Sequence, residues 1–177
     1  WRVRSVQILT ALLLYVIEKR GHDPERCTIG VVHEIVTASG QTLADILKSM
    51  MRSSQFVVRS EASLLSNMAS ADEAVNLLSN ISKGTGIWGE GRVLGRLPSG
   101  SDFDLERDVV GRVATLFVSV PEELKSVYAP FMRVMVGLSL QAVTRVCKQR
   151  VLPERPLFML DEAAALGHIP ELEDGMG

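Results

Sequence analysis

Two adjacent carboxylates, Asp161 and Glu162, stand directly after a short apolar run, Leu157-Phe-Met-Leu160. A run of this length and composition predicts a buried β-strand, and ligands of open α/β sheets bind at the carboxyl ends of such strands. A carboxylate there can hold Mg²⁺, usually through water, because Mg²⁺ takes oxygen ligands and gives up its water reluctantly. The second carboxylate can orient or deprotonate an attacking water. The pair therefore indicates Mg²⁺-dependent chemistry on phosphates, as in the Walker B motif.

A purely structural interpretation of the same two residues also stays open. Acidic side chains are favoured in the first turn of a helix, where they interact with the positive end of the helix dipole. A helix that follows the strand would account for Asp161 and Glu162 without catalysis.

A Walker B motif works together with a phosphate-binding loop, and the sequence contains no such loop. The nearest segment, Lys83-Gly-Thr-Gly86, lacks the order G-x-x-x-x-G-K-[ST] and follows no apolar strand. We expect it to be a flexible loop. The three histidines show no metal-binding spacing, so the one metal ion that we predict is Mg²⁺ at Asp161.

The composition limits the class of protein. The chain has 177 residues, 46% of them hydrophobic and 23% charged, which is typical of a folded domain and excludes a disordered chain. Its net charge of −2 excludes the strongly basic field of an autonomous DNA-binding domain. The two cysteines, Cys27 and Cys147, have no metal or disulfide spacing and predict a reducing compartment.

The first hundred residues are predicted to form a small helical bundle. Apolar residues recur there at spacings of three and four, between capping residues and glycines. The predicted helices cover residues 2–20 and 28–38 and then begin near Thr42, Ser60 and Ser70. In the first of them we expect Val3, Val6, Leu9, Leu13 and Val16 or Ile17 to form the apolar face. Its longest apolar run, residues 6–17, is shorter than the about 20 residues of a membrane span, so we interpret it as a core helix.

The pattern changes after residues 83–104, whose glycines and proline predict a loop or boundary. Residues 113–120 and 157–160 are predicted strands that are apolar enough to be covered on both faces. Between them a helix is expected from Pro130 to about Arg150, with Phe131, Val134 and Leu138 on its apolar face. The order strand, helix, strand predicts a β–α–β unit of a parallel sheet.

Several of these segments together resemble the TraG/TraD-type coupling ATPases of type IV secretion systems. Residues 157–174 are similar to the Walker B region of that family: an apolar strand, Asp-Glu, small residues, Leu-Gly and an acidic stretch. Residues 115–122 and 128–133 are similar to the strand and helix that precede this motif. Residues 101–105 and the opening segment resemble the family more loosely.

The resemblance implies a mainly α protein with an all-α domain over residues 1–104, which recruits cargo, and part of a RecA-like nucleotide-binding domain over residues 105–177. Proteins of this family are hexameric motors anchored in the bacterial inner membrane. They use ATP and Mg²⁺ to feed relaxase–DNA complexes or effector proteins to other secretion-system subunits. Asp161 matches the Mg²⁺-associated Asp that binds the cofactor, and Glu162 matches the catalytic Glu. Arg133 matches a recurrent Arg, whereas His168 departs from the Arg often found after Leu-Gly.

Two other functions stay open. One is a RecA-like hexameric DNA translocase of the FtsK or HerA type, against which the long all-α region argues. The other is a stand-alone helical docking module for proteins, without catalysis, which the near-neutral charge favours. Because the sequence contains neither the phosphate-binding loop nor the N-terminal membrane helices of that family, we expect this chain alone to bind no nucleotide tightly, to hydrolyse no ATP, to be soluble and to contact no membrane.

Overall fold

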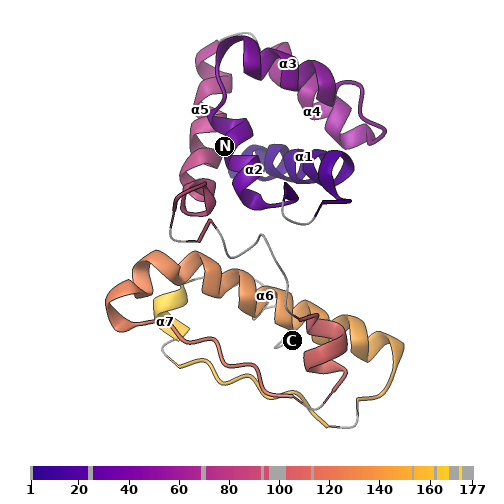
Figure 1. Cartoon of the computed structure of the whole chain (residues 1–177), viewed down its shortest axis with the longest axis vertical. Helices are drawn as coiled ribbons and strands as arrows, with labels where there is room; N and C mark the ends of the chain where they lie inside the picture. Colours follow the sequence, from indigo (N-terminus) through magenta and orange to yellow (C-terminus); the bar gives the residue numbers. More distant parts are fainter. Residues whose placement is uncertain are drawn as a thin grey trace. The chain divides into compact units, whose positions relative to one another are not determined.

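The computed structural model describes residues 2–23, 26–68, 71–92, 94–95, 103–112, 114–152, 154–161, 163–167 and 172. The chain divides into two compact units, Trp1–Gly100 and Ser101–Gly177 (Figure 1). The predicted boundary follows residue 104, and the roles assigned to the two parts stay predictions. The described residues are mainly helical and include no β-strand.

The first unit is all-helical, as predicted. Its elements are α1 (Arg2–Arg20), α2 (Ile29–Thr37), α3 (Gly40–Met50), α4 (Phe56–Ser66), α5 (Ala71–Thr85) and the 3₁₀ turn η2 (Gly86–Trp88). Helix α2 begins after Thr28, whose hydroxyl accepts a hydrogen bond from the Val31 N–H, an N-cap. The unit therefore has the bundle character expected from its periodicity.

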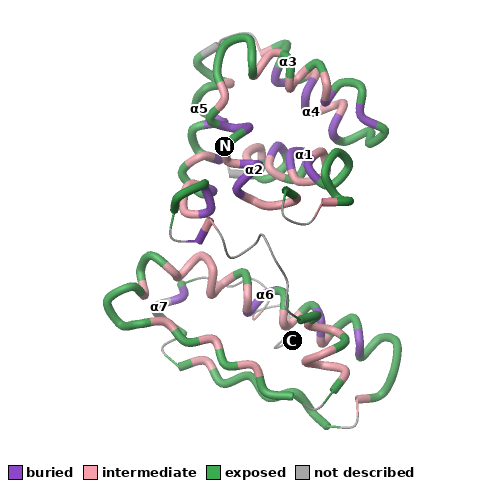
Figure 2. Tube along the Cα trace, in the orientation of Figure 1, coloured by how far each residue is buried: buried purple, intermediate pink, exposed green. Residues whose placement is uncertain are grey.

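A single apolar core holds these helices together, with buried residues on the sides of α1, α2, α4 and α5 (Figure 2). Burial of such side chains is the main favourable contribution to folding. The buried members are Ile8, Leu12, Val16, Val31, Val32, Ile35, Val36, Met50, Val58, Ala62, Leu65, Leu77, Leu78 and Ile81.

The apolar face predicted for the first helix was wrong at its start and right further along, because Val16 is buried and Leu9 and Leu13 pack against the core. Ile8 and Leu12 are fully buried in α1, whereas Val3 and Val6 are 74% and 56% exposed. The helix is apolar around most of its circumference, so more than one stripe has helical spacing. The neighbouring helices α2, α4 and α5 decide which stripe is buried, and the sequence of α1 does not contain that information.

Two polar contacts connect α1 to α4 and to the loop before it. Glu61, which is buried, accepts a hydrogen bond from Arg4 at 3.2 Å. At the other end of α1, the Glu18 carboxylate accepts hydrogen bonds from the Ser53 hydroxyl and from the Ser54 N–H, the latter at 2.9 Å. The hydrogen bond from Ser53, followed by that from Ser54, lowers the pKa of Glu18 below its ordinary value.

The predicted flexible loop at Lys83–Gly86 was also wrong. Helix α5 continues to Thr85, whose buried hydroxyl donates to the Ile81 carbonyl at 2.9 Å. The same oxygen lies 3.1 Å from Nδ1 of His33. Because a hydroxyl has one proton to donate, His33 is the donor in that contact. The turn that follows buries Trp88.

The second unit is arranged around one long helix, α6 (Lys125–Gln149). The π-helix η4 (Leu105–Val110) and the 3₁₀ turn η5 (Glu122–Leu124) precede it, and α7 (Ala163–Leu166) follows. Helix α6 begins before Pro130, where the predicted helix starts. Pro130 lacks an N–H and cannot bond to the carbonyl one turn earlier, a loss that α6 tolerates near its first turns.

The two predicted strands are extended segments without a strand ladder in the described part of the chain. Residues 114–120 begin close to Gly111. The Gly111 carbonyl accepts a hydrogen bond from Arg150, so this segment starts near the C-terminal end of α6. The segment ends at η5, just before the N-terminal end of α6. Residues 151–160 leave the same end of α6 and finish where Leu160 packs with Val136. Both segments therefore run opposite to α6 and in the same direction as each other (Figure 1).

One helical stretch, Glu122–Gln149, is long and apolar enough to cross a bilayer by length and composition. Core helices of soluble proteins meet the same criteria. Within its own unit this helix contacts η4, η5 and α7, and its Arg133 and Arg145 bind the Leu166 carbonyl and the Glu106 carboxylate.

Replacing Leu12 by Ala is expected to destabilise the first unit by about 2–5 kcal/mol, because it removes a fully buried side chain and leaves a cavity. Ile17→Ala in the same helix removes a side chain that is 56% exposed and should cost only about 0.5 kcal/mol. Urea unfolding followed by circular dichroism measures both. Equal effects of the two substitutions would contradict the orientation of α1.

The Glu18 contacts predict a dependence of stability on pH. Because the pKa of Glu18 is lowered in the fold, its carboxylate stabilises the protein above the ordinary value of 4.5, and this contribution is lost as the pH falls through the lower folded value. Glu18→Gln should therefore lower the melting temperature at neutral pH and have a smaller effect in acid. A difference from wild type that does not shrink in acid would show that charge is not involved.

Candidate functional site

Asp161 lies in a turn at the carboxyl end of the extended segment 151–160, and its side chain is exposed. The short helix α7 follows two residues later. Glu162, the predicted catalytic residue, lies outside the described residues. The structure therefore describes one of the two predicted carboxylates, at the end of an extended segment, and the roles of both residues stay predictions.

Helix α7 is attached to α6 by a polar and an apolar contact. Arg133 donates a hydrogen bond through Nη1 to the Leu166 carbonyl at 2.8 Å, and this is one of the carbonyls that a helix end leaves without an internal partner. The Leu166 side chain is buried with Val136. Gly167 then ends the helix at φ +70°, a left-handed conformation that glycine adopts without strain. These contacts fix the segment directly behind the two carboxylates.

Arg133 enters the sequence prediction only as a match to a recurrent arginine. In the structure Arg133 connects two helices, because its guanidinium on α6 donates a hydrogen bond to the last carbonyl of α7. No local sequence signal indicates that contact, since the two residues are far apart in the chain.

The donor set at Asp161 fits Mg²⁺ held mainly by other ligands. No group of three or more His, Cys, Asp or Glu side chains in the described part of the chain could enclose a metal ion. Mg²⁺ usually keeps several waters and takes one or two protein carboxylates together with phosphate oxygens. A single exposed aspartate at the end of an extended segment is compatible with that mode of binding.

The glycine-rich segment Lys83–Gly86 does not form a phosphate cradle. It belongs to the end of α5 and the start of η2, and the hydroxyl of Thr85 is engaged by Ile81 and His33. A phosphate-binding loop instead presents unengaged backbone N–H groups to the ligand.

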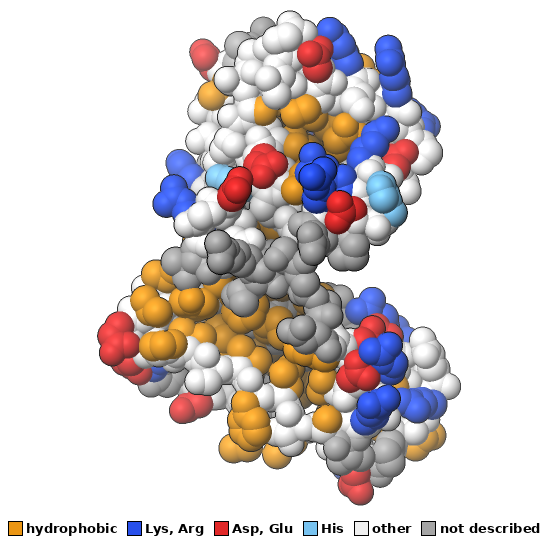
Figure 3. All heavy atoms as spheres, in the orientation of Figure 1, with side chains coloured by type: hydrophobic (Ala, Val, Ile, Leu, Met, Phe, Trp, Pro, Cys, Tyr) orange, Lys and Arg blue, Asp and Glu red, His pale blue; other side chains and the backbone are white. Residues whose placement is uncertain are grey.

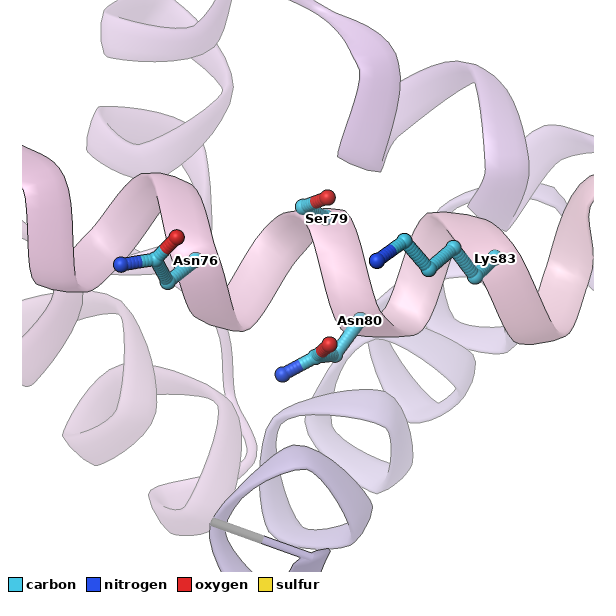
Figure 4. Close-up of a pocket in the computed structure, with 4 residues that line it drawn as sticks. All are labelled: Asn76, Ser79, Asn80 and Lys83. Carbon is cyan, nitrogen blue, oxygen red and sulfur yellow. The ribbon is translucent and has the colours of Figure 1, made fainter.

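An open recess of ≈ 260 Å³ lies along the exposed side of α5 (Figure 4). Its lining residues are Asn76, Ser79, Asn80 and Lys83, which are spaced so that they share one face of the helix. The recess offers amide, hydroxyl and ammonium groups and lacks an acid–base pair among its lining residues. It is therefore suited to hydrogen bonding with a polar partner and not to catalysis.

Comparison with known proteins identifies the family. The family model described as "Type IV secretory system Conjugative DNA transfer" matches residues 1–177, the whole of the sequence. Searches of curated proteins and of solved structures found no match. The family match confirms the resemblance seen in the sequence motifs. The chain therefore belongs to the type IV secretory system family of conjugative DNA transfer proteins.

Proposed function

We propose that this chain is part of a type IV secretion coupling ATPase that recruits relaxase–DNA or effector protein cargo and drives its transfer to the secretion channel. In this proposal Asp161 holds Mg²⁺ through water and Glu162 is the catalytic residue. The observation that carries the proposal is the position of Asp161, exposed at the end of an extended segment that returns beside the long helix α6. Family membership supports the general role in conjugative DNA transfer.

The exposure pattern of the extended segments supports a RecA-like α/β domain in residues 105–177. In residues 115–120, half-buried Leu116, Val118 and Val120 alternate with exposed residues, among them Phe117. Side chains of a β-strand alternate between the two faces of the sheet in this way. The segments therefore have the side-chain pattern of strands.

In the second extended segment residues 154–159 are all exposed, and only the degree of exposure alternates. Leu157 and Met159 are 82% and 85% exposed, whereas Phe158 between them is 36% exposed. Large apolar side chains on both faces are typical of strands in a parallel sheet that is covered on each side. Together with the shared direction of the two segments, this favours a β–α–β unit of a nucleotide-binding domain.

The chemistry that we propose follows from the two neighbouring carboxylates. Mg²⁺, when bound, would neutralise negative charge on the phosphates of ATP. Asp161 would accept hydrogen bonds from the water shell of the ion. Glu162 would orient the attacking water and accept its proton. Arg133 would take no direct part in these steps. It holds α7, which follows the two carboxylates in the sequence, against α6.

Cargo recruitment is assigned to the first unit. It has its own apolar core, and its surface carries exposed apolar side chains such as Phe56 and Val75 in addition to the polar recess on α5. Such a surface suits protein contacts, which also keeps a docking role without catalysis as the second candidate function. Hexamer formation and attachment to the inner membrane are part of the proposal through the family resemblance alone.

Asp161→Asn and Glu162→Gln are expected to lower Mg²⁺-dependent ATP hydrolysis strongly, but not to zero, in any longer form of this protein that includes a phosphate-binding loop. Glu162→Gln should lower turnover by at least about 100-fold with ATP binding retained, because it removes only the proton acceptor. Asp161→Asn should in addition raise the Mg²⁺ concentration needed for half-maximal activity. A coupled phosphate-release assay over a Mg²⁺ series measures both effects.

The matched control is Glu154→Gln, which neutralises an exposed carboxylate at the start of the same extended segment and should leave hydrolysis unchanged. The 177-residue chain without a phosphate-binding loop is expected to show no hydrolysis. Activity of this chain that Glu162→Gln removes would contradict the need for that loop, and full activity of both carboxylate variants would contradict the proposed site.

A further inference from the structure

A cluster of charged side chains, which we call the η4 cluster, surrounds the π-helix η4 and the C-terminal end of α6. It contains five cations and three carboxylates: Arg107, Arg112, Arg145, Lys148, Arg150, Asp104, Glu106 and Asp108. Figure 3 shows blue and red side chains gathered at this end of the second unit, next to a largely hydrophobic surface. The chain therefore has a local excess of positive charge here, although its overall net charge is −2.

The three carboxylates of the η4 cluster are already engaged within it. Asp108 accepts two hydrogen bonds from Arg107, at 3.0 and 2.7 Å, and one from the Asp104 N–H. The Arg107 guanidinium, more than the backbone contact, holds the pKa of Asp108 well below its usual range. Asp104 caps η4 through the Arg107 N–H, and Glu106 forms an ion pair with Arg145 at 2.8 Å.

The cluster has two more cations than carboxylates, and three of its cations make no ion pair shorter than 4.0 Å with a described residue. Arg112 is 75% exposed and reaches Asp108 only at 4.0 Å, and Lys148 has no ion pair with any residue that the structure describes. Arg150 donates through Nη2 to the Gly111 carbonyl at 3.4 Å. A β-carbon on Gly111 would lie 2.7 Å from the Arg107 carbonyl oxygen and 2.8 Å from that of Glu106, so the close approach of the backbone requires glycine at this position. The cluster thus presents exposed guanidinium groups of which Arg112 has one long ion pair, with Asp108, and Arg150 a backbone carbonyl as its partner.

The position of the η4 cluster separates it from the proposed nucleotide site. Arg112 and Arg150 stand at the beginning of the two extended segments, and Asp161 stands at the end of the second one. A phosphate bound at the cluster is therefore not the phosphate of a nucleotide at Asp161. Single-turn π-helices such as η4 are rare and occur frequently at functional sites.

We infer that the η4 cluster binds the phosphate backbone of DNA, with Arg112 and Arg150 as the principal contacts and Lys148 beside them. Guanidinium groups match phosphate oxygens with two parallel hydrogen bonds, a geometry they also form with carboxylates, so the test below includes an acidic competitor. The contacts are to the backbone and carry no base sequence. This inference rests on the proposed function in one respect, which is that the cargo includes DNA.

The test is the salt dependence of binding between the 177-residue chain and a short fluorescein-labelled DNA duplex, followed by anisotropy. Each phosphate contact that is lost should lower the slope of log affinity against log salt by about 0.9. Arg112→Gln combined with Arg150→Gln should therefore reduce the slope by about 2 and weaken binding by one to two orders of magnitude at about 0.1 M salt. Neither side chain is paired closely with a carboxylate, so circular dichroism should stay unchanged.

Arg52→Gln, in the loop between α3 and α4, is the matched control, because it removes one exposed guanidinium of the first unit, and it should leave the slope unchanged. Asp161→Asn should also bind DNA like wild type, which separates this inference from the ATPase proposal. The inference is overturned if the wild-type chain does not bind the duplex, or if the double variant keeps the wild-type slope. Polyglutamate that displaces DNA at equal charge concentration would instead assign the cluster to an acidic protein and also overturn it.

Discussion

The geometry of the second unit depends on one constraint. Helix α6 runs antiparallel to residues 114–120, so its C-terminal end lies beside the start of that segment. Twenty-five helical residues rise about 37 Å, enough to span a strand of eight residues with room at each end. Because of this return, residues 114–120 and 151–160 start at the same end of α6 and run in the same direction. The arginines that precede each segment then lie at one end, and Asp161 lies at the other.

The contacts that hold α6 in this role differ at its two ends. At the C-terminal end they are ionic, with Arg145 on Glu106 and Arg150 on the Gly111 carbonyl. Toward the N-terminal end, Val136 packs on Leu166, and Arg133 closes the end of α7. Exposed ion pairs contribute little stability and respond to salt. The apolar end therefore anchors the Asp161 segment, while the ionic end remains available for an anionic ligand.

Much of the fold was predictable from periodicity, and the failures have identifiable causes. The helical character of residues 1–100 follows from local spacing, but the buried stripe of α1 depends on Val32, Val58 and Leu77 of other helices, which local spacing does not include. The apolar runs 113–120 and 157–160 were predicted to be buried strands, whereas residues 114–120 and 157–160 are extended, with Phe117, Leu157 and Met159 exposed. A strand ladder requires neighbouring strands, and the described residues supply none.

The candidate site divides in the same way. Asp161 could be predicted, because an acidic residue after an apolar run is a local pattern. Its partner Glu162 lies outside the described residues and stays a prediction. The η4 cluster could not be predicted, because Arg107 and Arg112 meet Arg145 and Arg150 only after α6 has formed. The one local signal was Asp104, which stands three residues before Arg107 and accepts a hydrogen bond from its N–H. This spacing is typical of a helix cap and does not predict where the arginines lie.

The buried indole of Trp88 has a practical consequence. The chain contains two tryptophans, Trp1 and Trp88, and both belong to the unit Trp1–Gly100. Tryptophan emission therefore reports on the first unit alone, whereas circular dichroism sums the helices of both. Since Trp88 is shielded from water by η2 and the helices around it, its emission should shift to the red when that unit opens and stay constant when only the second unit does. The protein thus contains its own optical label for telling apart the unfolding of its two units.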